Sequence, residues 1–167
     1  MDITHGLQLV PAEQADVERI CSWVTSSTEA LTFAGPSLVY PFTAGEFFES
    51  AAGRWESFVL RAGSAAVATG ALEDKRQGEV RIGRVLVNPD HRGRGLGRTM
   101  MKRLIDRAAA RPGAACLTLS VFEGNRTARA LYESLGFNDS GGRVSVHVEE
   151  EVWIGLELEL ELASDIP

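Results

Sequence analysis

The segment 92–98 alternates arginine with glycine and is the part of the chain best suited to bind an anion. Its glycines carry no side chains, so a ligand can approach the backbone N–H groups closely. Arg92, Arg94 and Arg98 add full positive charges, and an amphipathic helix expected to begin here adds the positive end of its dipole. These features predict a site for a phosphate or pyrophosphate.

The spacing of this segment excludes two common phosphate-binding loops. A Walker loop needs Lys followed by Ser or Thr after its last glycine, and Arg98-Thr99 stands in that place. The dinucleotide fingerprint is G-x-G-x-x-G with an acidic residue about 20 positions further on, whereas this chain has G-x-G-x-G and no suitably placed acid. The sequence therefore argues against nucleotide hydrolysis and against dinucleotide binding.

A second segment, residues 117–137, reads as a strand followed by a short capped helix. Apolar residues alternate up to Phe122, and Asn125 is a favourable N-cap for the helix that follows. Gly136 stands where the C-terminus of a helix often needs a left-handed residue. Taken alone, this pattern predicts only local structure.

Together the two segments resemble the cofactor site of the GNAT N-acetyltransferase superfamily. The first motif is Arg92-x-x-Gly95-x-Gly97 after a strand end and Asn-Pro, and the second is Asn125 followed seven residues later by Tyr132 and then by Leu-Gly-Phe. The resemblance implies transfer of an acetyl group from acetyl-CoA to a primary amine of a small molecule or side chain. The cofactor-binding residues that it implies are Val85, Leu86, Val87, Arg92, Gly93, Arg94, Gly95, Leu96, Gly97, Arg98, Asn125 and Tyr132.

The resemblance also implies catalytic roles. Tyr132 matches the general acid that returns a proton to the CoA thiolate, although a tyrosine on a short helix is more often a packing residue. Members that acetylate protein N-termini carry a glutamate base five residues before the motif asparagine, where this chain has Ser120. This difference argues against that subgroup. Glu79, which could instead be a turn residue paired with Arg81, and His147 are the other candidates for the base.

The N-terminal part predicts the acceptor side. Apolar spacing predicts a helix over about 12–26, the segment 28–41 is predicted to be an irregular loop rich in large apolar groups, and Thr43 to Glu46 form a capping box that starts another helix. In the family this region walls the acceptor pocket. The resemblance therefore makes Phe33, Tyr40 and Phe47 candidates for lining that pocket, with burial in the core as the alternative.

The remaining pattern predicts an α+β fold. Strand-like runs cover 57–62, 65–72 and 79–87, and a helix covers 95–111. A polar segment at 138–142 precedes a closing hairpin of 144–148 and 152–162, with an acidic turn at 149–151. With the resemblance, this indicates a single GNAT-like domain over 1–167. Its sheet is expected to be mixed and mostly antiparallel, with about seven strands, about four flanking helices and a splay between two central parallel strands, where the pantetheine arm would lie.

Charge and composition bound the partners. The net charge is −6, with six glutamates between 149 and 161, a pattern typical of a solvated strand face and unfavourable for nucleic acid. The first five residues lack signal-peptide features, no stretch is long enough for a membrane span, and Cys21 and Cys116 are expected to be buried reduced thiols. These observations predict a cytoplasmic protein without a metal site. A homodimer and a non-catalytic acyl-CoA sensor remain open alternatives.

Overall fold

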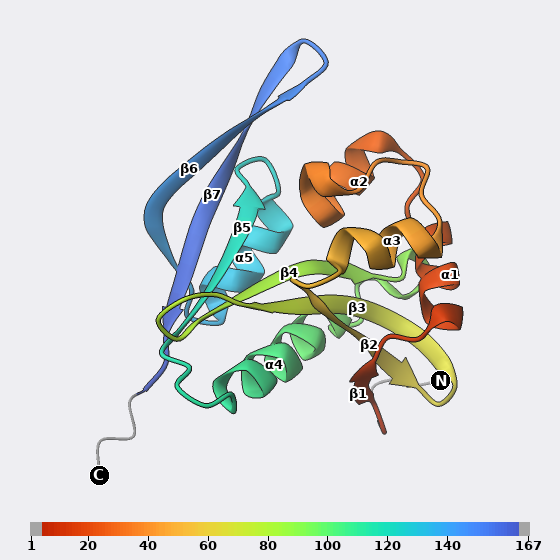
Figure 1. Cartoon of the computed structure of the whole chain (residues 1–167), viewed down its shortest axis with the longest axis horizontal. Helices are drawn as coiled ribbons and strands as arrows, with labels where there is room; N and C mark the ends of the chain where they lie inside the picture. Colours follow the sequence, from red (N-terminus) through yellow and green to blue (C-terminus); the bar gives the residue numbers. More distant parts are fainter. Residues whose placement is uncertain (1–4, 164–167) are drawn as a thin grey trace. The chain divides into compact units, whose positions relative to one another are not determined.

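The computed structural model describes residues 5–163, so the first four residues of the N-terminus and the last four of the predicted tail lie outside the described residues. The strands are β1 (Gln8–Pro11), β2 (Glu56–Ala62), β3 (Ala65–Asp74), β4 (Glu79–Val87), β5 (Cys116–Phe122), β6 (Asn138–Val148) and β7 (Glu151–Glu161). The helices are α1 (Gln14–Trp23), α2 (Ser27–Ala34), α3 (Ala44–Ala51), α4 (Leu96–Ala109) and α5 (Arg126–Ser134), with 3-10 turns η1 (Gly35–Ser37) and η2 (Pro89–His91) (Figure 1).

The strands form one sheet of seven in the order β1-β2-β3-β4-β5-β7-β6. The pairs β1–β2, β2–β3, β5–β7 and β6–β7 are antiparallel. β4 and β5 are parallel, with Glu79 opposite Cys116 and Arg81 opposite Thr118. The predicted mixed, mostly antiparallel sheet of seven strands is confirmed, while the splay and the single domain stay predictions.

Two compact units make up the chain. Unit 1 holds the residues up to Glu73 together with Ile82–Arg107, and unit 2 holds Asp74–Arg81 together with the residues from Ala108 onward. Each unit has buried apolar side chains of its own. Unit 1 contains the arginine–glycine loop, and unit 2 contains Asn125 and Tyr132.

The strands of unit 1 carry helices on both faces, with α3 and α4 on opposite sides (Figure 1). Neighbouring residues of a strand face opposite ways. Val59 accordingly belongs to the buried cluster built from α1, α2 and α3, whereas the ring of Phe58 lies 4.7 Å from the guanidinium carbon of Arg107 in α4. α4 packs so closely on β3 that a Cβ at Gly70 would lie 2.7 Å from Leu104 Cδ1.

α4 buries the apolar face that its residue spacing predicts. Leu96, Met100, Met101, Leu104 and Ala108 are buried, whereas Ile105, which the spacing places on the same face, is half-buried. Burial of Leu96 at the first helical position fixes the point at which the arginine–glycine loop becomes a helix. Leu96 thus anchors the N-terminal end of α4, which a phosphate would approach, in the core of unit 1.

Helix α2 was not predicted, since 28–41 was expected to be an irregular loop. Ser26 caps α2 by accepting a hydrogen bond from the Glu29 backbone N–H at 3.1 Å, and Gly35 ends the helix with a φ of 66°. The prediction was wrong because Gly35 and the prolines that follow dominated the pattern. The described residues therefore contain five α-helices rather than about four.

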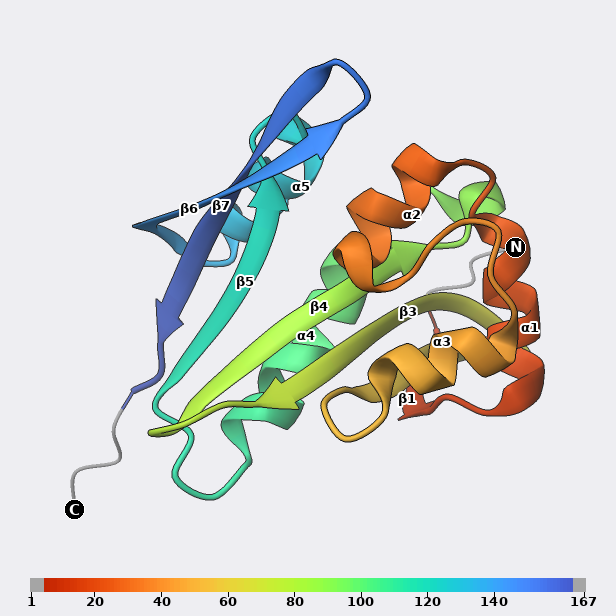
Figure 2. The ribbon, with the colours of Figure 1, turned by 45° about the horizontal axis from the view of Figure 1, so that its top comes forward.

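Unit 2 contains β5, β7 and β6 together with the first residues of β4, and α5 lies against one side of β5, β7 and β6 (Figure 2). Leu119 of β5 and Leu158 of β7 are directly opposite each other and both are buried, as is Phe137 just after α5. The opposite face of β5 and β7 carries Ser120 and Glu157, which are also directly opposite each other. One face of this small sheet is therefore apolar core and the other is polar.

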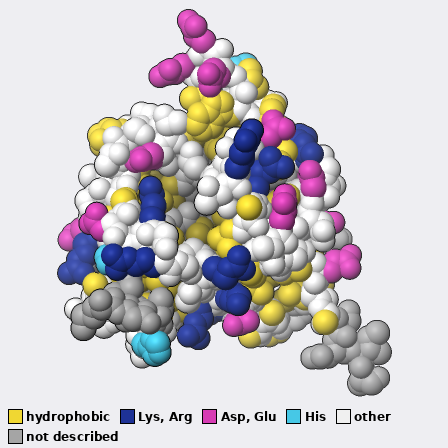
Figure 3. Space-filling view, turned by 180° about the vertical axis from the view of Figure 1, so that it is seen from behind, with side chains coloured by type: hydrophobic (Ala, Val, Ile, Leu, Met, Phe, Trp, Pro, Cys, Tyr) yellow, Lys and Arg dark blue, Asp and Glu magenta, His cyan; other side chains and the backbone are white. Residues whose placement is uncertain are grey.

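The polar segment 138–142 is part of β6, so this strand begins earlier than the expected run of 144–148. The strand continues through an irregular register between Asp139 and Arg143. Arg143 bonds both carboxylate oxygens of Asp139 at 2.8 and 2.7 Å, and this pairing lowers the pKa of Asp139 to about 2. The acidic turn predicted for the hairpin is confirmed at 149–150, and acidic side chains project at the tip (Figure 3).

Both cysteines are free thiols, but each is partly exposed rather than buried. Burial of part of each side chain still raises the pKa of Cys21 and Cys116 above the ordinary thiol value. Across residues 5–163, no helix has the length and hydropathy needed to cross a membrane.

Candidate active site

The arginine–glycine loop connects η2 to α4 within unit 1. Asn88 opens it by accepting a hydrogen bond from the Asp90 backbone N–H at 3.0 Å, so its side chain shapes the turn that Pro89 begins. Gly93 and Gly95 have φ values of 75° and 76°, in the left-handed region that glycine adopts without strain. The local sequence thus directs the chain into the start of α4.

The amide groups at the start of α4 are available to a ligand. The first helical hydrogen bond runs from the Thr99 N–H to the Gly95 carbonyl at 3.0 Å, so the amides of Leu96, Gly97 and Arg98 precede any intrahelical acceptor. Arg92, Arg94 and Arg98 are all exposed around this end of the helix. Amides, helix dipole and guanidinium groups therefore add up to a positive potential at one place.

The backbone of this loop is open to a pyrophosphate. A Cβ built on Gly93 or Gly95 would meet no heavy atom within 4 Å, so the space next to the backbone is free for phosphate oxygens. The residues present therefore suit the pyrophosphate of coenzyme A. Bound there, acetyl-CoA would supply an activated thioester.

β4 leads directly into this loop. Val85, Leu86 and Val87 are each half-buried, and Leu86 packs against the buried cluster beneath α1 to α3. Arg84, just before them, has a φ of 53°, which is unusual for a residue other than glycine and marks an irregularity in the strand. The role of residues 85–87 in binding the cofactor arm stays a prediction.

In unit 2, the second motif forms the helix start that was predicted. The side chain of Asn125 accepts a hydrogen bond from the Ala128 backbone N–H at 3.3 Å and so caps α5. Tyr132, two turns further on, packs edge-to-face against Phe137 with ring centroids 6.3 Å apart. Burial raises the pKa of Tyr132 to about 12, so the phenol is a proton donor at neutral pH.

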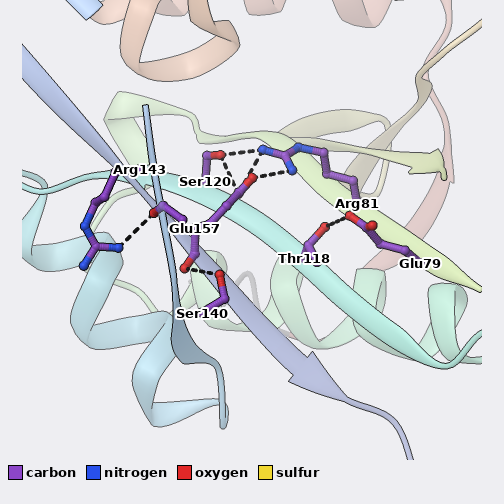
Figure 4. A network of polar contacts seen from close by, with 8 residues as sticks. Glu79, Arg81, Thr118, Ser120, Ser140, Arg143 and Glu157 are labelled. Atoms are coloured by element: carbon purple, nitrogen blue, oxygen red, sulfur yellow. Dashed lines mark hydrogen bonds and ion pairs between the residues drawn. The ribbon is translucent and has the colours of Figure 1, made fainter. Parts of the chain in front are cut away.

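A polar network lies on the open face of unit 2 (Figure 4). Arg81 binds Glu157 through two nitrogens at 2.7 and 3.2 Å, and it also donates to the hydroxyl of Ser120. Ser120 donates in turn to Glu157 Oε2 at 2.9 Å. Three acceptor positions of Glu157 are occupied, so it is an anchor rather than a free base.

Glu79 lies beside this network and has a different partner. Its Oε1 accepts a hydrogen bond from the Thr118 hydroxyl at 2.6 Å, whereas Arg81 pairs with Glu157 and leaves Glu79 without that arginine. Glu79 is half-buried, while His147 is exposed opposite Val152 in the hairpin. Glu79 therefore has the more structured surroundings of the two predicted bases.

The glutamates of β7 do not behave alike. Glu159 and Glu161 are exposed, in agreement with a solvated strand face, but Glu157 is half-buried in the network with Arg81 and Ser120. The sequence interpretation missed this role of Glu157. Period-two alternation placed all three on one face, but only the register between β5 and β7 puts Glu157 opposite Ser120.

The aromatic residues predicted for the acceptor pocket belong to the buried cluster of unit 1. Phe33 of α2 and Phe47 of α3 stack with centroids 6.3 Å apart, and Tyr40 packs against the same cluster. A hollow of about 310 Å³ opens beside them. Its lining consists of Ser37, Leu38, Val39, Glu46, Glu49 and Ser50. Contact of the three aromatic residues with an acceptor stays a prediction.

The chain is an α+β protein in which the end of β4 and the N-terminus of α4 flank a loop suited to a phosphate group. A family model described as acetyltransferase (GNAT) family matches residues 18–137, and the chain belongs to this family. The resemblance inferred from the two motifs is thereby confirmed.

Relatives with assigned activities match part of the chain. It is 45% identical over 62 residues to a [Ribosomal protein bS18]-alanine N-acetyltransferase of Escherichia coli K12, which is 37% of this chain and 41% of that protein. It is 36% identical over 69 residues to a spermine/spermidine N(1)-acetyltransferase of Bacillus subtilis 168, or 41% and 45% of the two chains. The chain therefore spans less than half the length of these two relatives in the matched regions.

The fold extends over nearly the whole chain. The crystal structure of spermidine N-acetyltransferase from Vibrio cholerae in complex with CoA and spermine superposes with a TM-score of 0.76, covering 93% of this chain and 95% of that one. The identity is 18%, so this likeness is one of fold.

Proposed function

We propose that this protein transfers an acetyl group from acetyl-CoA to the primary amine of a small molecule or side chain. The single observation that carries the proposal is the loop of residues 92–98, which combines left-handed glycines beside open space, the amides at the start of α4 and three arginines. Membership of the acetyltransferase family supports the same ligand. The family resemblance, taken residue by residue, extends the cofactor site to Val85–Val87, Asn125 and Tyr132.

In the proposed reaction a neutral amine attacks the thioester carbonyl, and the chain's own groups do three things. Amides and arginines of the loop hold the cofactor in place. Backbone N–H groups of Val85–Val87 polarise the carbonyl that is attacked. Tyr132 gives its proton to the departing thiolate, a role for which its raised pKa keeps it protonated.

A protein N-terminal amine is the second candidate acceptor. The similarity to the bS18-alanine N-acetyltransferase favours it. Ser120 favours the small amine or side chain, because its hydroxyl is bound to Arg81 and Glu157 and cannot accept a proton usefully at neutral pH. Both acceptors would use the same cofactor loop.

Thiol release from acetyl-CoA tests the function directly. The acceptor panel contains ribosomal-protein N-terminal peptides, polyamines, amino acids and aminoglycosides, with an incubation lacking amine as the control. We expect release with a small amine, and a preference for an N-terminal peptide would instead support the second candidate. CoA binding without release across the whole panel would mean that the protein is an acyl-CoA sensor.

The base is a separate proposal with its own test. An ammonium acceptor must lose a proton before it attacks, so kcat/KM should fall on the acidic side. We expect Glu79→Gln to lower kcat/KM and change this acidic limb, because Glu79 is a half-buried carboxylate that accepts a hydrogen bond from the neutral Thr118 hydroxyl. His147→Gln is the parallel variant. If neither variant moves the rate or the limb, deprotonation occurs through water or before binding.

A further inference from the structure

Arg84 is a buried cation without a carboxylate partner. Its exposed fraction is 5%, and among the described residues no Asp or Glu forms an ion pair with it. Burial, reinforced by the positive charge of Arg54, lowers the pKa of Arg84 to about 10, so it remains charged at neutral pH. A buried arginine is ordinarily paired with an anion, because an unpaired charge loses its hydration without compensation.

The groups that contact Arg84 are neutral. Its Nη2 donates to Ser50 Oγ at 2.9 Å and to Ser37 Oγ at 3.3 Å, and its Nη1 donates to the Phe47 carbonyl at 3.4 Å. The guanidinium carbon also lies 5.4 Å from the centroid of the Phe47 ring. A guanidinium has five N–H donors, so these contacts orient Arg84 and leave donor capacity for a further acceptor.

Two of the residues that contact Arg84 also line the hollow of about 310 Å³. Ser37 and Ser50 each accept a hydrogen bond from Arg84 Nη2, so these two serines connect the guanidinium to the wall of the hollow. All of these residues belong to unit 1. Figure 1 shows α3 on the upper side of β3 and β4 in this unit.

The rim of the hollow has the opposite charge. Glu46 and Glu49 of α3 line it and are exposed. Glu46 accepts hydrogen bonds from the N–H and hydroxyl of Thr43, at 2.8 and 3.0 Å, so its carboxylate is held in the helix cap. A ligand that suits this arrangement carries a carboxylate for Arg84 and an ammonium group for the acidic rim.

We propose that the hollow binds the carboxylate of the acceptor through Arg84, so that the preferred acceptor is an amino-carboxylate zwitterion such as an amino acid or short peptide. The inference rests on the proposed acetyl transfer and names its substrate class. Arg84 directly precedes Val85–Val87, the strand segment proposed to face the cofactor arm. A carboxylate bound at Arg84 would therefore anchor the acceptor next to that strand, while polyamines, which lack a carboxylate, would gain nothing from it.

Matched acceptor pairs test the proposal. Thiol release is measured with L-amino acids and dipeptides, each compared with its own C-terminal carboxamide. We expect the wild-type kcat/KM to favour the carboxylate by about 10²-fold or more, because the neutral carboxamide leaves the Arg84 guanidinium without a charged partner. In Arg84→Gln this preference should fall to roughly threefold or less, because kcat/KM for the carboxylate falls much more than kcat/KM for the carboxamide.

Two further variants separate recognition from structure. Arg54→Gln removes a nearby positive charge outside the hollow and should keep the preference for the carboxylate. Ser50→Ala leaves Arg84 in place but removes its shortest hydrogen bond, so it should reduce the preference partially. If Arg84→Gln does not fold, the proposal is still tested by the comparison of acids with carboxamides in the wild type and in Ser50→Ala.

Equal rates for acids and carboxamides in the wild type would overturn the proposal while leaving acetyl transfer intact. Absence of thiol release with every acceptor would refute the proposed function instead. In that event, calorimetric titration with N-acetyl amino acids and their carboxamides tests whether the hollow binds a carboxylate. Binding of the carboxylate that is lost in Arg84→Gln supports the site, and equal binding of both, or of neither, rejects it.

Discussion

Gly95→Val should weaken CoA binding by about 10²-fold or more while the protein remains folded. Gly95 has a φ of 76°, which a β-branched residue adopts only with strain, and its missing side chain leaves the space that the pyrophosphate is expected to occupy. A valine therefore both strains the loop and occupies that space. Calorimetric titration with CoA measures the affinity, and thermal unfolding shows that the variant is folded.

Gly113→Val is a matched control for backbone strain. Gly113 also has a φ of 76°, and a Cβ there would likewise meet nothing within 4 Å, but it lies in the connection between α4 and β5. Both variants should lose comparable stability, whereas only Gly95→Val should lose CoA affinity. Unchanged affinity in Gly95→Val would refute the assignment of residues 92–98 to the pyrophosphate.

Tyr132→Phe should lower kcat by about 10²-fold or more and leave CoA affinity unchanged. The substitution removes the phenolic proton but keeps the ring that packs against Phe137. Because burial raises the pKa of Tyr132 to about 12, the donor stays protonated through the neutral and mildly alkaline range. The contribution of Tyr132 should therefore be lost only as the pH approaches that value.

As controls, the stability and the CoA affinity of Tyr132→Phe are compared with those of the wild type. If the melting temperature and the CoA dissociation constant match the wild type, a fall in turnover reports the lost proton rather than altered packing. Turnover at the wild-type rate would place Tyr132 among packing residues. A variant that loses stability and turnover together would point to the contact with Phe137 as its main role.

Features that depend on near neighbours in the chain were determined by the sequence. The capping box of Thr43 and Glu46, the Asn125 cap of α5 and the buried face of α4 all join residues three or four positions apart. The left-handed glycines of the anion loop are equally local, since φ at Gly93 and Gly95 reflects the missing side chain. Helix α2 carried a local signal as well, Ser26 followed three residues later by Glu29.

The tertiary structure alone decided which distant residues meet. Glu157 became the partner of Arg81, 76 positions away, because the order β4-β5-β7 and the register of β5 on β7 bring the two side chains together. Arg84 became a buried cation because Phe47 and Ser37, 37 and 47 positions away, fold over it. Alternation along a strand assigns a side chain to a face, but register and burial are set by packing between segments, which no local pattern encodes.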